Sequence, residues 1–139
     1  WIDWSAADDD LVQYTAHLLA LRRRHLPLAG RWYSGLPDAR GRADLAWTGE
    51  QGQALEAAAW QDGTRRLLAA HIGTPGRGTD AVVLLFTASP SEVAFQLPPG
   101  GWQLELDSTE GNGRRHWVGS SRITAPARSV LVLRETTRA

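Results

Sequence analysis

The sequence predicts a mainly β protein, an antiparallel β-sandwich preceded by one long amphipathic α-helix. From residue 67 onward, short apolar stretches alternate with turns that contain Gly or Pro, which is typical of a sandwich. Residues 5–28 instead repeat apolar side chains with the period of an α-helix. The chain has 139 residues, which is long enough to bury a single hydrophobic core.

The predicted helix covers residues 5–28. Ser5 and Asp8 have the spacing of a capping box, and Pro27 is expected to end the helix. A projection at about 100° per residue places seven apolar side chains on one continuous arc. They are Leu11, Val12, Tyr14, Leu18, Leu19, Leu21 and Leu26. An arc of this width predicts that the helix docks against another surface.

Two polar side chains interrupt this apolar arc. Arg22 lies close to its centre and His25 lies within it. A charge at such a place must be paired, or must reach water along its aliphatic stem. Two interpretations stay open for Arg22. It either anchors an interface that offers it an acceptor, or it extends to a nearby carboxylate.

The strands are predicted from apolar runs and from alternation. The main ones are expected at residues 67–72, 81–87, 91–97, 102–107 and 127–134, with weaker candidates at 31–33, 43–47, 115–118 and 121–124. Residues 81–87 and 127–134 are apolar on both faces, which predicts strands covered on both sides. In residues 102–107 the alternation predicts that Trp102, Leu104 and Leu106 point inward. Residues 54–60 are compatible with one helical turn.

Composition excludes several classes of function. The 15 basic residues balance the 15 acidic ones, so no long-range field favours nucleic acid or an anionic membrane. There is no cysteine for a disulfide or a thiolate metal site, and no apolar run of membrane-spanning length. We therefore expect a cytoplasmic protein. Because the chain also lacks methionine, we expect a piece of a longer polypeptide.

The sequence contains no complete active site. Glu105 and Asp107 are two residues apart on a predicted strand, about 6 to 7 Å from each other, which suits a glycosidase carboxylate pair. A solvent-facing position is the favoured interpretation for both. The four histidines form no metal-binding motif, and no phosphate-binding or nucleophile motif is present. We expect no cofactor and no metal.

Several motifs, in a shared order, resemble a known enzyme family. Trp1-Ile2-Asp3-Trp4 and the helix that follows resemble the end of the catalytic barrel in glycoside hydrolase family 13 debranching enzymes, the bacterial glycogen debranching enzymes and isoamylases. Leu21 to Pro27 resembles the Leu-Arg-x-x-His-Pro end of their last barrel helix, with one extra residue. Further similar segments are Asp44-Leu45-Ala46-Trp47, Leu106-Asp107-Ser108 and Ala127-Arg128-Ser129-Val130.

The resemblance implies a division of the chain and a role for each part. Residues 1–29 would be the final barrel helix, and residues 30–139 the C-terminal sandwich that braces the barrel. The parent enzyme hydrolyses α-1,6 branch linkages with carboxylates on earlier barrel strands, so no catalytic residue is assigned here. The implied barrel interface comprises Leu11, Tyr14, Leu18, Arg22 and His25. Trp1, Asp3 and Trp4 would lie at the catalytic rim and are candidates for contact with sugar, unless they pack under the helix.

Two other functions remain open. The chain could be a freestanding carbohydrate-binding sandwich, in which Trp32 or Trp117 stacks on glycogen or another α-glucan. It could also be a small hydrolase that uses Glu105 and Asp107. Most of the seven tryptophans are expected in the core or at interfaces. Without a barrel, the apolar helix is expected to fold back onto the sandwich or to self-associate with a second copy.

Overall fold

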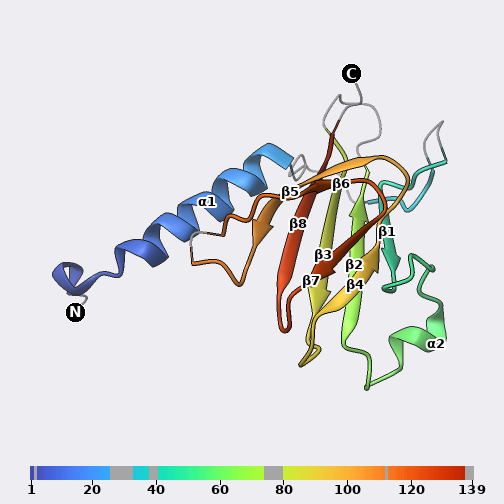
Figure 1. Ribbon diagram of the computed structural model, residues 1–139, viewed down its shortest axis with the longest axis horizontal. Coiled ribbons are helices and arrows are strands. Elements are labelled where there is room, and N and C mark those ends of the chain that lie inside the picture. The colour runs from blue at the N-terminus through green and yellow to red at the C-terminus, as the bar shows by residue number, and fades with distance from the viewer. Residues whose placement is uncertain (2, 26–32, 38–40, 74–79, 112, 137–139) are drawn as a thin grey trace.

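The computed structural model describes residues 1, 3–25, 33–37, 41–73, 80–111 and 113–136 (Figure 1). A long helix leads into two antiparallel sheets packed face to face. The elements are the 3-10 helix η1 (Trp4–Ala6), α1 (Asp9–His25), β1 (Leu45–Thr48), α2 (Ala57–Trp60), β2 (Leu67–Ile72), β3 (Val82–Thr87), β4 (Val93–Gln96), β5 (Gly101–Asp107), β6 (Val118–Gly119), β7 (Arg122–Ala125) and β8 (Val130–Thr136).

The two sheets differ greatly in width. The larger has six strands in the order β1-β2-β3-β8-β5-β6, and the smaller pairs β4 with β7. All strand pairs are antiparallel. The predicted helix-plus-sandwich architecture is therefore confirmed, and each main predicted strand is present. The helical turn considered for residues 54–60 is present as the short helix α2 at Ala57–Trp60.

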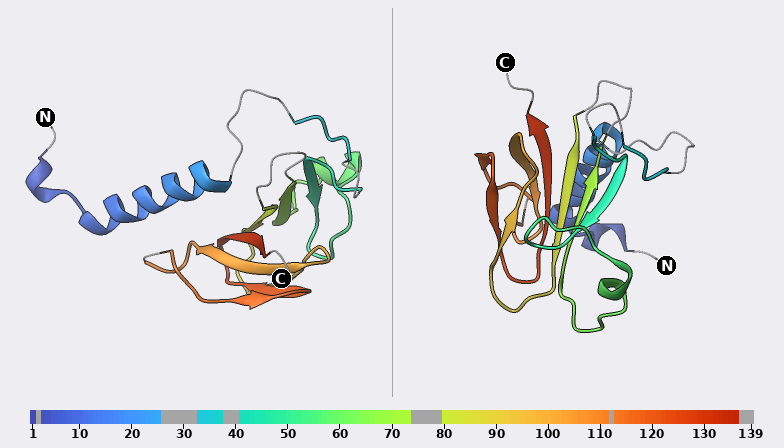
Figure 2. Two further views of the ribbon diagram at one scale, coloured as in Figure 1. Left: turned by 90° about the horizontal axis from the view of Figure 1, so that it is seen from above. Right: turned by 90° about the vertical axis from the view of Figure 1, so that its right-hand side faces the viewer.

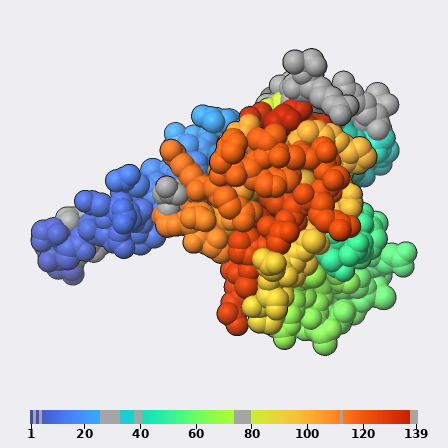
Figure 3. All heavy atoms as spheres, viewed as in Figure 1, coloured from blue at the N-terminus to red at the C-terminus, as the bar shows by residue number. Residues whose placement is uncertain are grey.

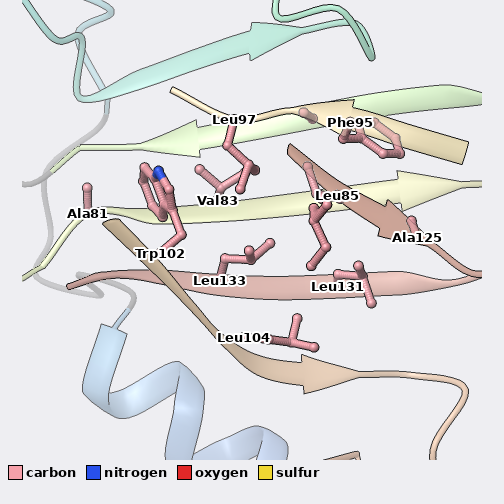
Figure 4. Packing of buried hydrophobic residues seen from close by; sticks show 12 residues of the cluster. Ala81, Val83, Leu85, Phe95, Leu97, Trp102, Leu104, Ala125, Leu131 and Leu133 are labelled. Carbon is pink, nitrogen blue, oxygen red and sulfur yellow. The ribbon is translucent and has the colours of Figure 1, made fainter. Parts of the chain in front are cut away.

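The hydrophobic core lies between the sheets, as Figure 4 shows. Phe95 of β4 projects toward Leu85 and Leu131 of the large sheet, and all three are buried almost completely. Strands β3 and β8 lie side by side in the middle of the six-stranded sheet, so both contribute to the core through alternate residues. We call this core-lining side the inner face of the large sheet and the opposite side its outer face.

One strand departs from simple alternation. Leu104 pairs with Leu133, but Leu106 pairs with Val132, so β5 contains a bulge between these two leucines. The extra residue reverses the alternation. Leu104 belongs to the core cluster, whereas Leu106 is buried on the outer face. The prediction that Leu106 points inward beside Leu104 was wrong for this reason.

The start of α1 also differs from the prediction. The helix begins at Asp9, and the Leu11 backbone N–H donates to Oδ1 of Asp8 at 3.1 Å. Asp8 is thus the N-terminal cap. Ser5, in η1, instead donates through its backbone and its hydroxyl to the carboxylate of Asp3, the residue before η1. The predicted Ser5–Asp8 capping box was wrong because a nearer carboxylate binds Ser5. Helix α1 ends at His25, and Pro27 lies outside the described residues.

Helix α1 points away from the sandwich (Figures 1 and 2) and stands out as a separate arm in Figure 3. Its C-terminal part is docked, since Leu21 and His25 are buried. At its N-terminal end Leu11 is 61% and Val12 59% exposed, and farther along the helix Leu19 is 45% exposed. Of the two expected outcomes for the apolar arc, folding back onto the sandwich therefore does not extend to Leu11 and Val12, and self-association with a second copy stays a prediction. No helix within the described ranges is long and apolar enough to cross a membrane.

Candidate functional site

The first candidate site is the junction where α1 meets the outer face of the large sheet. Gly113, with φ of +70°, lies beneath the helix. A methyl group on Gly113 would lie 2.7 Å from Cδ1 of Leu106, 3.0 Å from Cε2 of Tyr14 and 3.5 Å from Cδ2 of His17. The helix therefore packs directly against backbone that only glycine leaves open.

A polar network lies on the same outer face. The guanidinium of Arg134, in β8, donates to Oε1 of Glu105 at 2.9 Å and to Oδ2 of Asp80 at 3.0 Å. It also donates to Oε1 of Gln103 at 2.9 Å. The hydrogen bond to Glu105, followed by that to Asp80, raises the pKa of Arg134 above its ordinary value. This network joins β5 and β8 to Asp80, two residues before β3.

His25 brings the end of α1 to this network. Its side chain is buried, and its Nε2 atom has no hydrogen-bond partner in the part of the chain that the structure describes. Burial lowers the pKa of His25, and the positive charge of Arg134 adds to this effect, while the carboxylate of Glu105 opposes it. A neutral imidazole therefore fits the docked helix end better than a charged one.

The five predicted interface residues lie along the whole helix. Leu11 and Arg22 are exposed, Tyr14 and Leu18 are partly buried, and His25 is buried. Arg22 has no carboxylate within ion-pair distance among the described residues. The part of the chain that the structure describes thus offers Arg22 no ion-pair partner. A role for these residues in contact with a catalytic barrel stays a prediction.

The three candidates for sugar contact lie at the far end of the arm. Trp1 is fully exposed, so it does not pack under the helix. The Asp3 carboxylate accepts from Ser5 Oγ at 2.6 Å and from Ser5 N at 2.9 Å, and these bonds lower the pKa of Asp3. Trp4 opens η1. Contact of Trp1, Asp3 or Trp4 with sugar also stays a prediction.

The two carboxylates considered for hydrolysis are both engaged in other contacts. Glu105 pairs with Arg134, as described above. Asp107 is completely buried, forms a 3.1 Å ion pair with Arg115 and accepts from the Thr109 hydroxyl at 2.7 Å. The solvent-facing position predicted for Asp107 was wrong, because the β5 bulge and the following turn enclose it. The described residues also contain no group of three or more His, Cys, Asp or Glu that could hold a metal.

A second candidate site is a cleft of about 580 Å³ that the sequence did not indicate. Its described lining comes from β1 and the turn after it, from β2, from the end of β4, and from the segments that link β4 to β5 and β6 to β7. The lining residues are Thr48, Gln51, Gly52, His71, Gln96, Leu97, Pro98, Pro99, Ser120 and Ser121. Thr48 Oγ1 and His71 Nε2 lie within hydrogen-bond distance, at 2.8 Å. No sequence motif unites these separate segments.

The tryptophans divide between core and surface. Trp102 is buried, and its Nε1 donates to the Pro98 carbonyl at 2.9 Å. Trp117 is partly buried against the core and is not an open stacking surface; Trp32 lies outside the described residues. Trp47 and Trp60 form an edge-to-face pair with centroids 5.7 Å apart, and they are 36% and 50% exposed.

Comparison with known proteins identifies relatives of this chain. No protein-family model matches the sequence. The glycogen debranching enzyme of Serratia proteamaculans (strain 568) is 33% identical over 115 residues, which are 82% of this chain and 16% of the relative. That of Dickeya chrysanthemi is 32% identical over 105 residues, 75% of this chain and 14% of the relative.

A solved structure also overlaps part of the chain. It is the pullulanase complexed with maltotetraose from Anoxybacillus sp. LM18-11, with a TM-score of 0.43 and 15% identity over 51% of this chain and 10% of that one. The sequence relatives extend over most of this chain, which spans only 14–16% of their length. The chain therefore belongs to the family of the bacterial glycogen debranching enzymes and corresponds to a part of them.

Proposed function

We propose that this chain is the C-terminal, non-catalytic domain of a debranching enzyme that hydrolyses α-1,6 branch linkages in glycogen or starch. In this proposal residues 1–29 complete the catalytic barrel, and residues 30–139 form the sandwich that braces it. The observation that carries the proposal is the helical arm, which is docked at one end and presents apolar side chains to solvent at the other. We also propose the cytoplasm as its location.

The exposed part of the arm needs a partner for energetic reasons. Complete burial of an aliphatic side chain such as Leu11, Val12 or Leu19 contributes roughly 1.5–3 kcal/mol. The exposed guanidinium of Arg22, in the same helix, requires an acceptor when it is covered. A barrel that offers apolar side chains and one carboxylate would satisfy both requirements. A second copy of the chain is the competing partner.

The non-catalytic role is tested with the chain alone. We expect no release of reducing ends when it is incubated with amylopectin, because Glu105 and Asp107 are held by Arg134 and Arg115. The matched variant is Glu105→Gln. Reducing-end release by the wild-type chain that disappears in this variant would overturn the proposal and would favour a small hydrolase.

The bracing role is tested by complementation. The Serratia enzyme is produced without the region that matches this chain, and this chain is then added in trans. We expect complex formation and a higher melting temperature of the truncated enzyme. A triple variant, Leu11→Gln with Val12→Gln and Leu19→Gln, should lose both effects.

The control for this test is Leu36→Gln. Leu36 is 70% exposed, and residues 33–37 lie on the opposite side of the sandwich from the arm (Figures 1 and 2). This variant should bind like wild type. Equal binding by the triple variant, or no binding by any variant, would contradict the bracing role. A sedimentation experiment that finds a stable dimer of the isolated chain, lost in the triple variant, would assign the arm to self-association instead.

One observation favours a second candidate function, the carbohydrate-binding sandwich. The Trp47–Trp60 pair combines exposure with a fixed edge-to-face geometry, which suits stacking against sugar rings. Retardation of the chain by glycogen in a native gel, lost in Trp60→Ala, would support this function. Absence of retardation would leave the aromatic pair without a role in glucan binding.

A further inference from the structure

We propose that the cleft between the two sheets binds a neutral polyhydroxylated ligand, namely a segment of an α-1,4-linked glucan chain. The cleft exists because the two-stranded sheet is narrower than the six-stranded one and leaves the inner face near β1 and β2 uncovered. Its volume of about 580 Å³ lies within the usual range for small-molecule sites. The choice of a glucan rests on the proposed function.

The polar groups of the cleft suit hydroxyl groups. None of the described lining residues is an acid, a lysine or an arginine. The lining offers side-chain hydroxyls from Thr48, Ser120 and Ser121 and amides from Gln51 and Gln96. Hydroxyl groups donate and accept, and an amide offers both functions, as each sugar hydroxyl requires. A phosphate or carboxylate ligand would instead need a cationic partner, which this lining does not supply.

His71 contributes as a neutral group. Burial lowers the pKa of His71, so its imidazole is uncharged near neutral pH. One ring nitrogen, Nε2, lies 2.8 Å from Thr48 Oγ1. The neutral ring has one donor and one acceptor nitrogen. Thr48 and His71 can therefore hydrogen-bond to each other and also to a ligand hydroxyl. Leu97, Pro98 and Pro99 add an apolar surface against which the C–H groups of a sugar ring can pack.

Backbone hydrogen bonds hold the walls of the cleft together. The Gln96 N–H donates to the Glu50 carbonyl at 2.7 Å, which joins β4 to the turn after β1. The Leu97 N–H donates to the Ser121 carbonyl at 2.8 Å, which joins the segment after β4 to the segment before β7. The turn after β1, the end of β4 with the segment that follows it, and the segment before β7 are therefore held in place before a ligand enters. This preorganisation reduces the entropy lost on binding.

The test is an NMR titration of the ¹⁵N-labelled chain with maltotetraose. We expect saturable shifts of the amide signals of Thr48, His71, Gln96 and Ser121. Ser120→Trp, at an exposed lining position, should fill the mouth of the cleft and weaken the apparent affinity by about tenfold or more. Gln51→Ala, which removes one amide, should weaken it less. Ser91→Trp introduces the same side chain at an exposed position beyond the other end of β4 and should bind like wild type.

A second arm uses glycogen in place of the oligosaccharide. Selective broadening of the same signals would assign the cleft to the outer chains of the polymer, and a response to maltotetraose alone would assign it to free oligosaccharides. The inference is overturned if neither glucan shifts the cleft signals, if Ser120→Trp binds like wild type, or if only Trp47 and Trp60 respond. If the cleft does not bind glucan but the chain still stabilises the truncated Serratia enzyme, the bracing role stands and only the proposed glucan site is rejected.

Discussion

The two faces of the six-stranded sheet are completed in different ways. Over β3 and β8 the inner face is covered by β4 and β7, which place Phe95 and Ile123 in the core. The outer face carries the Arg134 network and receives α1 from Tyr14 to His25, whereas Leu11 and Val12 stay exposed. The inner face is buried by strands of this same chain, and this burial stabilises the fold. The outer face and the arm instead have the features of a surface that a partner would cover.

The largest expected effect comes from truncating the inner face. Phe95→Ala should lower the free energy of unfolding by about 3–5 kcal/mol, because it leaves a large cavity between the sheets. The chain offers a matched control, since its only other phenylalanine, Phe86, is partly buried on the outer face of β3. Urea denaturation of both variants measures the difference. An equal loss of unfolding free energy in Phe86→Ala would mean that Phe86 on the outer face is as well buried as Phe95 in the core.

The second effect concerns the contact between α1 and the sheet. Gly113→Ala should destabilise the fold by roughly 1–3 kcal/mol, through overpacking against Leu106 and Tyr14. The positive φ of Gly113 adds backbone strain. The control is Gly111→Ala in the same loop, where an added methyl group has no heavy atom within 4 Å. We expect NOEs between the Tyr14 ring and the Leu106 methyls to weaken only in Gly113→Ala. Retention of these NOEs at full strength would show that the helix does not rest on Gly113.

The sequence predicted the sheet well where local patterns decide the structure. Residues 67–72 and 81–87 are apolar runs bounded by polar and turn residues, and they form β2 and β3. The sequence-based prediction failed where two possible helix caps compete and where a β-bulge interrupts the alternation of a strand. Ser5 and Asp8 are both good caps, and the choice depended on Asp3. The β5 bulge has no sequence signature, so the orientation of Leu106 and the burial of Asp107 could not be predicted.

The candidate sites illustrate the same limit. The helical period correctly singled out His25 as a polar residue within an apolar arc. The helical period could not identify the neighbours of His25, because Glu105 and Arg134 lie far from it along the chain. The cleft draws on residues between Thr48 and Ser121, which only the packing of the two sheets brings together. Sites built from long-range contacts of this kind leave no spacing in the sequence.

A third prediction uses pH to loosen the helix end. Burial lowers the pKa of His25 below its ordinary value of 6.5, so below that pH the unfolded chain binds more protons than the folded one. The free energy of unfolding should therefore fall as the pH is lowered from about 6.5, and should level off below the folded-state pKa. Urea denaturation between about pH 7 and pH 5 measures this slope.

The histidine in the cleft provides the control for this measurement. Burial also lowers the pKa of His71, so it contributes in the same direction. His25→Gln should remove part of the slope and His71→Gln another part. Only His25→Gln should remove the pH dependence of NOEs between α1 and the sheet. A full slope in His25→Gln would mean that the helix end does not sense protonation.

The smallest expected effect separates the two halves of α1. Leu11→Gln combined with Val12→Gln should change the free energy of unfolding of the isolated chain by less than about 0.5 kcal/mol, because both side chains are exposed. Glutamine has a helix propensity close to that of leucine and better than that of valine, so the helix itself is not weakened. Leu21→Gln, at the docked end, should be clearly more destabilising because Leu21 is buried. Urea denaturation at two protein concentrations distinguishes the outcomes: a large, concentration-dependent loss in the Leu11/Val12 variant would show that the arm is already covered by a second copy of the chain.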